Sequence, residues 1–379
     1  MAIEIREVTT KKELKQFIQF GIDLFKGNPY YCPPLVFDEI NTFDTTKNPA
    51  HEICDHIIYM AYQDGKIVGR IVGIINHKAN EKWENKRLRF GWFDFMDDLA
   101  VSKALLEAVQ AWGKAHGMTE MNGPVGFTDF DHQGLLIEGF EYSSPMASLY
   151  NYPYYEKHFE AFGLQKEIDW IEYRLTMPDE VPPRMKRLAG VVMEKSKLTI
   201  HKIRSIKELK KYYPNNEYLD VIDQAYQKLY NYQPLTEKQK TYYSNMYFPL
   251  LNFDFITIVI NELKEIVGVG LGMPDISDAL RKAKGRLFPF GWYHILKALK
   301  AKKNMMYFDM LIIAVRPDYQ NKGVNALFFY DTAQSFVKYG VKYAETTSIL
   351  ETNNKSQANF DEYEKIQHKR RSAYLKPIA

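Results

Sequence analysis

Apolar and polar positions follow the same order twice along this chain. Residues 3–17 and 198–212 both alternate apolar and polar side chains and then place apolar side chains at helical spacing. Between the two patterns, each copy has a hydroxyl residue followed three positions later by a glutamate, the signature of a helix-capping box: Thr10 with Glu13 and Ser205 with Glu208. Each copy is therefore expected to begin with a strand and a capped helix.

The match continues in the same order. Residues 62–74 and 261–273 each predict a hairpin, and residues 88–93 and 310–315 each predict a central strand that precedes a helix. The complete order in each copy is strand, helix, hairpin, strand, helix, strand, helix, strand. This order predicts an α/β fold: two tandem domains, each a mostly antiparallel, twisted mixed sheet with helices on both faces.

The matching segments place the boundary near the middle of the chain. We predict a first domain over residues 1–177, a linker with a short helix over 178–196, and a second domain over 197–379. The spacing of the copies changes twice, which indicates an insertion in the first copy at about residues 122–145 and one in the second at 275–304.

Composition narrows the class of protein. The chain has 379 residues, 46% of them hydrophobic and 26% charged, which is typical of a globular protein. A net charge of +3 is too small to indicate nucleic-acid binding. Two cysteines, a charged N-terminus and apolar runs no longer than a strand predict a cytoplasmic protein without disulfides, signal peptide or transmembrane segment.

Residues 316–329 are the candidate ligand-binding loop. They follow the predicted strand 310–315 and lead into a helix, where unpaired N–H groups and the helix dipole favour an anion. The same local pattern also fits a turn that binds nothing. In the first copy the equivalent residues, 94–100, contain three aspartates and no glycine, which would repel a phosphate. We therefore predict phosphate binding in the second copy alone.

The element order together with this loop resembles the GNAT acyltransferase superfamily. The family's loop motif is Q/R-x-x-G-x-G/A; Gln320 and Gly323 match it, whereas Asn325 stands where glycine or alanine is usual. The resemblance implies that acetyl-CoA or another acyl-CoA is the cosubstrate. It implies that the loop binds the pyrophosphate and that the strand edge pairs with the pantetheine arm. The cofactor-binding residues so implied are Ile313, Val315, Gln320, Asn321, Lys322, Gly323, Val324, Asn325, Ala326 and Asn353.

The catalytic residues stay open. The family places a tyrosine, a common proton donor, four residues after a small residue that is Ser356 here; this chain has Phe360 instead. Tyr363, one turn later, is a substitute candidate, although it also fits a packing role. Asp131 and His132 in the first insertion could serve as base or hold an amine, or could belong to an ordinary turn. No metal site is expected.

The tandem arrangement also resembles two further groups. One is the Fem-type aminoacyl-tRNA-dependent transferases. The other is a set of bacterial two-domain GNAT proteins with the motifs NP-x-(Y/W)-x-PP, GP…G-x-L-x-x-GF and YN-x-P-YY, which here are residues 28–34, 123–140 and 150–155. The resemblance implies an acyl-CoA-dependent N-acyltransferase that acts on a primary amine of a small molecule or peptide. The alternatives are a Fem-like transferase, with tRNA as partner, and an inactive binding or scaffold protein. The acceptor, acyl chain and oligomeric state stay open.

Two basic tracts have more than one interpretation. The insertion 275–304 combines many lysines with an apolar helical stripe of Trp292, Ile295, Leu296 and Leu299. Such a helix can lie on a membrane surface or a polyanion, or it can cap a domain with its lysines in water. The tract 368–371, His-Lys-Arg-Arg, predicts a solvated strand face. The tyrosine clusters at 150–155 and 242–247 predict packing in the core and between domains.

Overall fold

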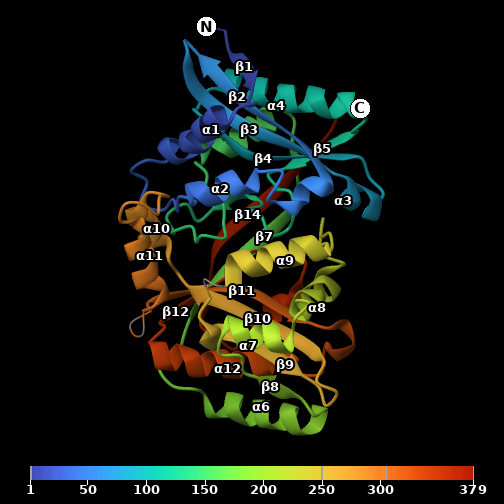
Figure 1. Cartoon of the computed structure of the whole chain (residues 1–379), viewed down its shortest axis with the longest axis vertical. Coiled ribbons are helices and arrows are strands. Elements are labelled where there is room, and N and C mark those ends of the chain that lie inside the picture. Colours follow the sequence, from blue (N-terminus) through green and yellow to red (C-terminus); the bar gives the residue numbers. More distant parts are fainter. Residues whose placement is uncertain (1, 249–250, 302, 304, 379) are drawn as a thin grey trace.

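The computed structural model describes residues 2–248, 251–301, 303 and 305–378 and has two α/β halves, one above the other in Figure 1. The elements of the first half are β1 (Glu4–Glu7), α1 (Lys11–Leu24), α2 (Val36–Thr42), η1 (Pro49–Glu52), β2 (Cys54–Gln63), β3 (Lys66–Asn76), α3 (His77–Lys82), β4 (Arg87–Phe95), α4 (Leu99–Ala115), β5 (Glu120–Gly123), β6 (Leu135–Glu138), α5 (Tyr154–Ala161) and β7 (Gln165–Thr176).

The second half repeats the order with additions. Its elements are α6 (Pro183–Ser196), β8 (Thr199–His201), α7 (Ile206–Tyr212), α8 (Glu217–Tyr226), α9 (Glu237–Tyr247), η3 (Phe253–Phe255), β9 (Ile256–Ile260), β10 (Ile266–Pro274), α10 (Ser277–Ala283), α11 (Gly291–Leu299), β11 (Tyr307–Val315), η4 (Pro317–Tyr319), α12 (Val324–Tyr339), β12 (Tyr343–Thr346), β13 (Ile349–Leu350), α13 (Asn354–Ala358) and β14 (Lys365–Pro377). Helices α8 and α9 were not identified from the sequence.

The start of each copy follows the prediction. In the first, Thr10 accepts a hydrogen bond from the Glu13 N–H and the Glu13 carboxylate accepts one from the Thr10 N–H, so the capping box is complete. In the second, Ser205 accepts from the Glu208 N–H, but the Glu208 carboxylate accepts from the N–H of Arg204, one residue earlier. A strand followed by a capped helix is thus confirmed in both copies.

Helices cover both faces of the sheet. Gly21 of α1 lies over Arg70 of β3, whereas side chains of α4 lie over the neighbouring residue, Gly69. Successive residues of a strand point to opposite faces, so α1 and α4 cover opposite faces of the first half. In the second half, Val267 of β10 packs in the core with α12, and Val269 packs in the core with α8. The predicted mixed α/β class is confirmed.

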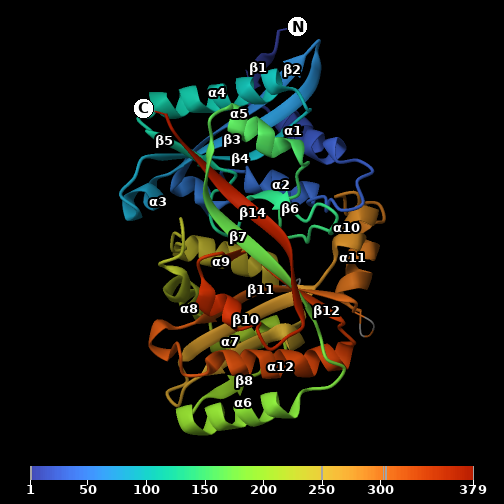
Figure 2. The same cartoon turned by 180° about the vertical axis from the view of Figure 1, so that it is seen from behind.

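The two halves share their last strands. Within the described residues the strand order is β1-β2-β3-β4-β5-β14-β7-β12-β11-β10-β9-β8, with β6 on β14 and β13 on β7. The chain's last strand, β14, therefore pairs with β5 of the first half, and β7 pairs with β12 of the second. Figure 2 shows β7 and β14 side by side as they run from one half to the other. The result is one continuous sheet, in which hydrogen bonds between backbones join the halves.

The prediction for residues 368–371 was wrong. His368, Lys369 and Arg371 are buried, because β14 lies in the middle of the sheet with protein on both faces. Glu172 of β7 neutralises Arg371, whose Nε lies 2.5 Å from Glu172 Oε1. Burial opposes ionisation of Glu172, but Arg371 and Lys369 outweigh it and lower the pKa of that carboxyl. The alternation of residues correctly identified a strand at 368–371, but it could not show that the charged side chains form ion pairs inside the protein.

Glu345 of β12 completes this buried cluster. Its Oε2 lies 3.1 Å from Lys369 Nζ and 3.0 Å from His368 Nε2. Burial again opposes ionisation, and the hydrogen bond from His368 with the charge of Lys369 holds the pKa of Glu345 well below its usual range. No helix among the described residues has the length and apolar content to cross a membrane.

Arg371→Met should destabilise the protein strongly. It leaves Glu172 buried without its closest cation, and breaking a buried ion pair from one side costs about 3–5 kcal/mol. The matched control is Arg6→Met, which removes an exposed ion pair with Glu4 and should cost less than about 1 kcal/mol. Urea unfolding followed by circular dichroism measures both. Equal unfolding midpoints for the two variants would contradict the role given to the buried pair.

Candidate functional site

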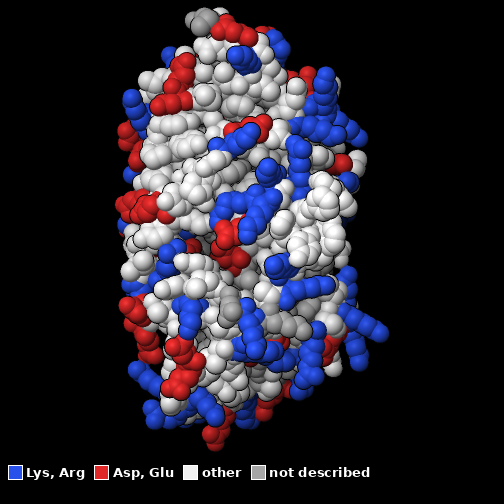
Figure 3. All heavy atoms as spheres, turned by 90° about the vertical axis from the view of Figure 1, so that its left-hand side faces the viewer, with Lys and Arg blue, Asp and Glu red and all other residues white. Residues whose placement is uncertain are grey.

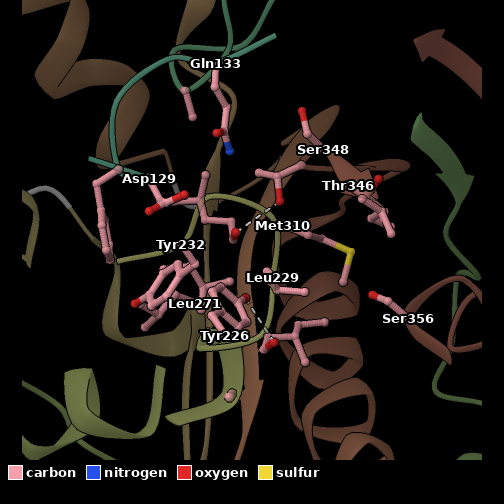
Figure 4. Close-up of a pocket in the computed structure, with 18 of the residues that line it drawn as sticks. Asp129, Gln133, Tyr226, Leu229, Tyr232, Leu271, Met310, Thr346, Ser348 and Ser356 are labelled. Atoms are coloured by element: carbon pink, nitrogen blue, oxygen red, sulfur yellow. Dashed lines mark hydrogen bonds between the residues drawn. The ribbon is translucent and has the colours of Figure 1, made fainter. Parts of the chain in front are cut away.

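A cavity opens where β11 and β12 separate. The two strands pair in parallel only from Tyr307 to Met310 and from Tyr343 to Thr346; beyond this, β13 pairs with β7 instead. The far part of β11 consequently has a free edge. The cavity beside it has a volume of about 1130 Å³, and residues of both halves line it (Figure 4).

The loop after β11 forms one end of this cavity. Asn321 and Gly323 have positive φ angles of 64° and 79°, and α12 begins directly afterwards. Among the described residues, no acceptor is recorded for the backbone N–H groups of Asn321, Gly323, Val324 and Asn325, and all four residues line the cavity. Free N–H groups at a helix N-terminus attract an anion. The loop therefore has the features of a phosphate site.

Gly323 is required by its surroundings as well as by its φ angle. A Cβ at this position would lie 2.7 Å from Cγ2 of Val192, on helix α6. Helix α6, the predicted linker helix, thus supports the loop from outside. The local sequence indicated a glycine turn, but only the tertiary structure shows which helix packs against it.

Most of the implied cofactor residues border the cavity. Ile313, Val315, Gln320, Asn321, Gly323, Val324, Asn325 and Asn353 line it. Lys322 and Ala326 are not among the lining residues; the Lys322 ammonium lies 4.5 Å from the centre of the Tyr319 ring. Asn353 accepts a hydrogen bond from the Ser356 N–H and so caps α13.

The edge of β11 presents backbone groups to the cavity. The Ile313 carbonyl accepts a hydrogen bond of 3.1 Å from the Tyr226 hydroxyl, and the Val315 carbonyl accepts one from the side-chain amide of Gln320. The N–H and C=O of one residue in an extended strand point to the same edge. The N–H groups of Ile313 and Val315 are therefore directed to this side, where a ligand can pair with them.

Asn325 has a structural role that explains its departure from the family motif. Its Nδ2 donates a hydrogen bond of 2.8 Å to Oδ1 of Asn359, just after α13. This bond connects the start of α12 to the segment that carries Phe360. Phe360 is buried and lines the cavity. Tyr363 is not among the lining residues; its ring packs 5.9 Å from that of Phe329, and burial raises its pKa to about 12.

The first half contributes carboxylates to the opposite wall. The insertion places Asp129, Asp131 and His132 in the lining, and α2 adds Asp38 and Glu39. Burial raises the pKa values of Asp38, Asp129 and Asp131 to about 6 each. Asp38 and Glu39 were not identified from the sequence, because nothing in the local pattern shows that helix α2 faces a cavity.

The side chains of Asp129, Asp131 and His132 differ in the hydrogen bonds that they already make within the protein. Asp131 accepts a hydrogen bond of 2.9 Å from the Thr128 N–H, and His132 bonds through Nε2 to the Met146 carbonyl. His132 lines the cavity, and desolvation there lowers its pKa. Asp129 accepts a longer bond, 3.2 Å, from the Gln233 N–H. Figure 4 shows its carboxylate on the cavity wall.

The acids of the first copy's equivalent loop have structural roles. Asp98 caps α4 by accepting a hydrogen bond from the Ala100 N–H. Asp94 lies buried at the end of β4 and pairs with Arg70 at 2.6 Å between Arg70 Nη2 and Asp94 Oδ2. Asp97 accepts from His158. The first half therefore has a strand, an ion pair and a helix cap where the second has its glycine loop.

The rest of the lining is largely apolar and aromatic. Tyr243 packs between the halves, as predicted, and stacks on Phe130 at 4.8 Å. Tyr226 and Tyr232 line the cavity, and Figure 4 shows them near Leu229 and Leu271. Burial raises the pKa of Tyr226 to about 12. Among the described residues, no group of three or more His, Cys, Asp or Glu could hold a metal ion.

Comparison with known sequences gives two relatives that match over most of their length. The Escherichia coli (strain K12) protein YghO is 30% identical over 359 residues, which covers 92% of this chain and 89% of YghO. The bacterial ceramide synthase of Caulobacter vibrioides is 26% identical over 311 residues, which covers 79% of this chain and 77% of that enzyme. No family model matches the chain.

Solved structures identify the fold. A tandem GNAT protein from the clavulanic acid biosynthesis pathway superimposes with a TM-score of 0.56 at 11% identity, covering 100% of this chain and 99% of that one. A probable N-acyltransferase from Enterococcus faecalis superimposes with a TM-score of 0.53 at 9% identity, covering 100% and 73%. At such identities the likeness shows the fold alone, and it confirms the tandem GNAT arrangement.

Asp129→Asn should increasingly stabilise the protein relative to the unmodified chain as the pH rises from about 4 to about 6, and the difference should stay constant above that. A carboxyl whose folded pKa of about 6 exceeds its unfolded value loses stability as pH rises through that range. The asparagine keeps the acceptor for Gln233 without the charge. Thermal unfolding at each pH measures the difference. Asp64→Asn, in the exposed β2–β3 turn, is the control, and a pH-independent difference for Asp129→Asn would contradict the assignment.

Proposed function

Because the chain belongs to the family of the Escherichia coli protein YghO and has the tandem GNAT fold, we propose that it is an acyl-CoA-dependent N-acyltransferase. One observation carries this proposal. A single cavity has free backbone N–H groups of the 321–325 loop at one end and four carboxylates of the first half on its other wall. The free N–H groups suit a donor that carries phosphate, and the carboxylates suit a cationic amine.

The residues of the second half fit an acyl-CoA. The N–H groups of Asn321, Gly323, Val324 and Asn325 would hold the pyrophosphate, and the free edge at Ile313 and Val315 would pair with the pantetheine arm. When bound, the thioester supplies an acyl group activated for transfer. The first half lacks an equivalent loop, so we propose one acyl-CoA site per chain.

The first half would bind the amine and take its proton. Asp129, with a pKa of about 6, is ionised at neutral pH and is matched to accept a proton. The bound ammonium first releases one proton to solvent, which frees the nitrogen lone pair. The neutral amine nitrogen then forms a bond to the thioester carbonyl carbon, the carbon–sulfur bond breaks, and Asp129 receives the second proton that the nitrogen loses. An N–H of the β11 edge near Val315 would polarise the carbonyl oxygen.

We propose that Tyr226 donates a proton to the departing sulfur. Its hydroxyl bonds to the backbone of Ile313, the strand edge that would hold the thioester, and its high pKa keeps it protonated at neutral pH. The position that carries tyrosine in the family motif is Phe360 here and has no proton to give. Tyr226 lies on α8, a helix of the second half, and so replaces that tyrosine from a different element.

The lining favours substrates with long hydrocarbon chains. A cavity of about 1130 Å³ exceeds the range of about 300–1,000 Å³ usual for small-molecule sites. Its apolar residues include Leu229, Leu271, Met273, Leu280 and Met310. One relative is named a bacterial ceramide synthase, and a ceramide is the amide of a fatty acid with a long-chain amino alcohol. We propose a fatty acyl donor and a long-chain primary amine as acceptor.

Asn325→Glu should weaken binding of coenzyme A by about tenfold or more, because it places a carboxylate beside the proposed pyrophosphate site. Calorimetry with coenzyme A measures the affinity. Ala100→Glu is the matched control, since it adds the same charge at the equivalent second position of α4 and should leave the affinity unchanged. Gly323→Glu should abolish binding, but it also disturbs the contact with Val192. Unchanged affinity in Asn325→Glu, or heat only with charged tRNA, would contradict the proposed site.

Tyr226→Phe should slow acyl transfer by about a hundredfold while leaving the affinity for coenzyme A unchanged, because it removes a proton donor and keeps the ring. Release of free thiol from a long-chain acyl-CoA in the presence of a long-chain primary amine measures the rate. Tyr363→Phe, whose ring lies outside the cavity, should keep the full rate. Binding of coenzyme A without thiol release across a panel of amines would instead indicate an inactive binding protein.

A further inference from the structure

The insertion that forms α10 and α11 has a buried face and an exposed apolar face. On the buried side, Ile295 of α11 packs in one core cluster with Leu280 of α10, and Leu280 also lines the cavity. The exposed side carries a set of aromatic and aliphatic residues, which we call the α11 patch: Phe288, Phe290, Trp292, Tyr293 and Leu296. The exposed fractions of Phe288 and Phe290 are 79% and 73%.

Exposure of this extent distinguishes the patch from ordinary surface residues. Single apolar side chains are common on protein surfaces, but five large exposed ones within nine consecutive positions are an unusual concentration. Aromatic rings are the side chains that favour the boundary between water and lipid. Phe288 and Phe290 lie in the loop before α11. A partner that covers the patch must therefore provide an apolar environment for these two rings.

The surroundings of the patch are basic. Residues 277–303 contain eight lysines and arginines and a single carboxylate, Asp278, which pairs with Arg281. Within the described chain no ion pair is recorded for Lys282, Lys284, Lys297, Lys300 or Lys303, all of which are exposed. The segment's charge exceeds the net +3 of the whole chain, so the rest of the molecule is net acidic. Figure 3 views this side of the molecule, where lysine and arginine side chains are frequent, with uncharged surface between them.

We propose that the α11 patch docks this protein on the surface of a membrane that contains anionic lipids. The apolar rings enter the interface while the lysines contact the headgroups, the combination by which amphipathic helices bind such membranes. Helix α10 separates the patch from the cavity and lines the latter with Leu280, so docking places the cavity one helix away from the lipid. This inference rests on the proposed function, because a long-chain amine is supplied by a membrane.

Sedimentation with vesicles tests the proposal on the full chain. Vesicles of phosphatidylcholine mixed with phosphatidylglycerol should bind the protein, and high salt should weaken the binding because it screens the lysines. Phe288→Ser with Phe290→Ser should reduce the bound fraction at least about tenfold, and so should Lys297→Glu with Lys300→Glu. Absence of binding by the unmodified protein, or equal binding to phosphatidylcholine alone at any salt, would overturn the proposal.

Matched controls separate the patch from general effects. Leu188→Ser with Val191→Ser removes exposed apolar surface from α6, and Lys12→Glu with Lys15→Glu reverses exposed charge on α1. Neither pair should alter vesicle binding; losses equal to those of the patch variants would overturn the assignment to α11. Capture of the patch by a protein partner would leave vesicle binding unchanged in all variants, which also overturns it.

A second measurement distinguishes this proposal from the proposed function. With a short, water-soluble amine and acyl-CoA and no vesicles, the Phe288→Ser, Phe290→Ser variant should turn over at the unmodified rate. Its rate with a long-chain amine presented in anionic vesicles should fall with its vesicle binding. Vesicle binding without any acyl transfer would contradict the proposed function but support the docking surface. Turnover of soluble substrates without vesicle binding would support the proposed function but contradict the docking surface.

Discussion

The pairing of β7 with β14 is the interaction on which the rest of the molecule depends. Each of these long strands belongs by sequence to one half and completes the sheet next to the other half. Domains joined by a flexible linker would be free to move relative to one another, but a continuous sheet fixes them through hydrogen bonds between backbones. The cavity lies between the two halves, so its shape depends on this pairing, and the buried pair of Arg371 and Glu172 connects the same two strands.

The two halves differ at the start of their equivalent helices, α4 and α12. In the second, the chain turns at Gly323 and leaves its N–H groups free; in the first, Asp98 caps the equivalent helix and so satisfies the N–H groups that a phosphate would need. The first half instead presents carboxylates from α2 and from its own insertion. Under the proposed function, the loop would bind the phosphates of the donor and the carboxylates would bind a cationic acceptor in the same cavity.

Local patterns predicted much of the fold. The helix caps at Thr10 and Ser205, the hairpins and the strand before residue 316 depend on interactions within a few residues, and each is present, although only the first cap is a complete capping box. The loop at Gln320 and Gly323 was predicted for the same reason. Helices α8 and α9, which carry Tyr226 and Tyr243, were missed because they lie outside the segments whose sequences match between the two copies. The sequence also did not show that β7 and β14 pair with strands of the other half. The alternation of apolar and polar residues in a strand is the same whichever neighbour it pairs with.

The sequence by itself determined the elements, their order, the duplication and the position of the glycine loop, because these follow from the spacing of side chains along the backbone. Only the tertiary structure decided which polar side chains are buried and where they meet. It placed His368, Lys369 and Arg371 inside the sheet beside Glu172 and Glu345, and it placed Tyr363 outside the cavity lining. It also brought Asp129 and Tyr226, almost a hundred residues apart in the chain, to one cavity. Burial and charge pairing between distant residues depend on packing in three dimensions, which a pattern along one dimension does not contain.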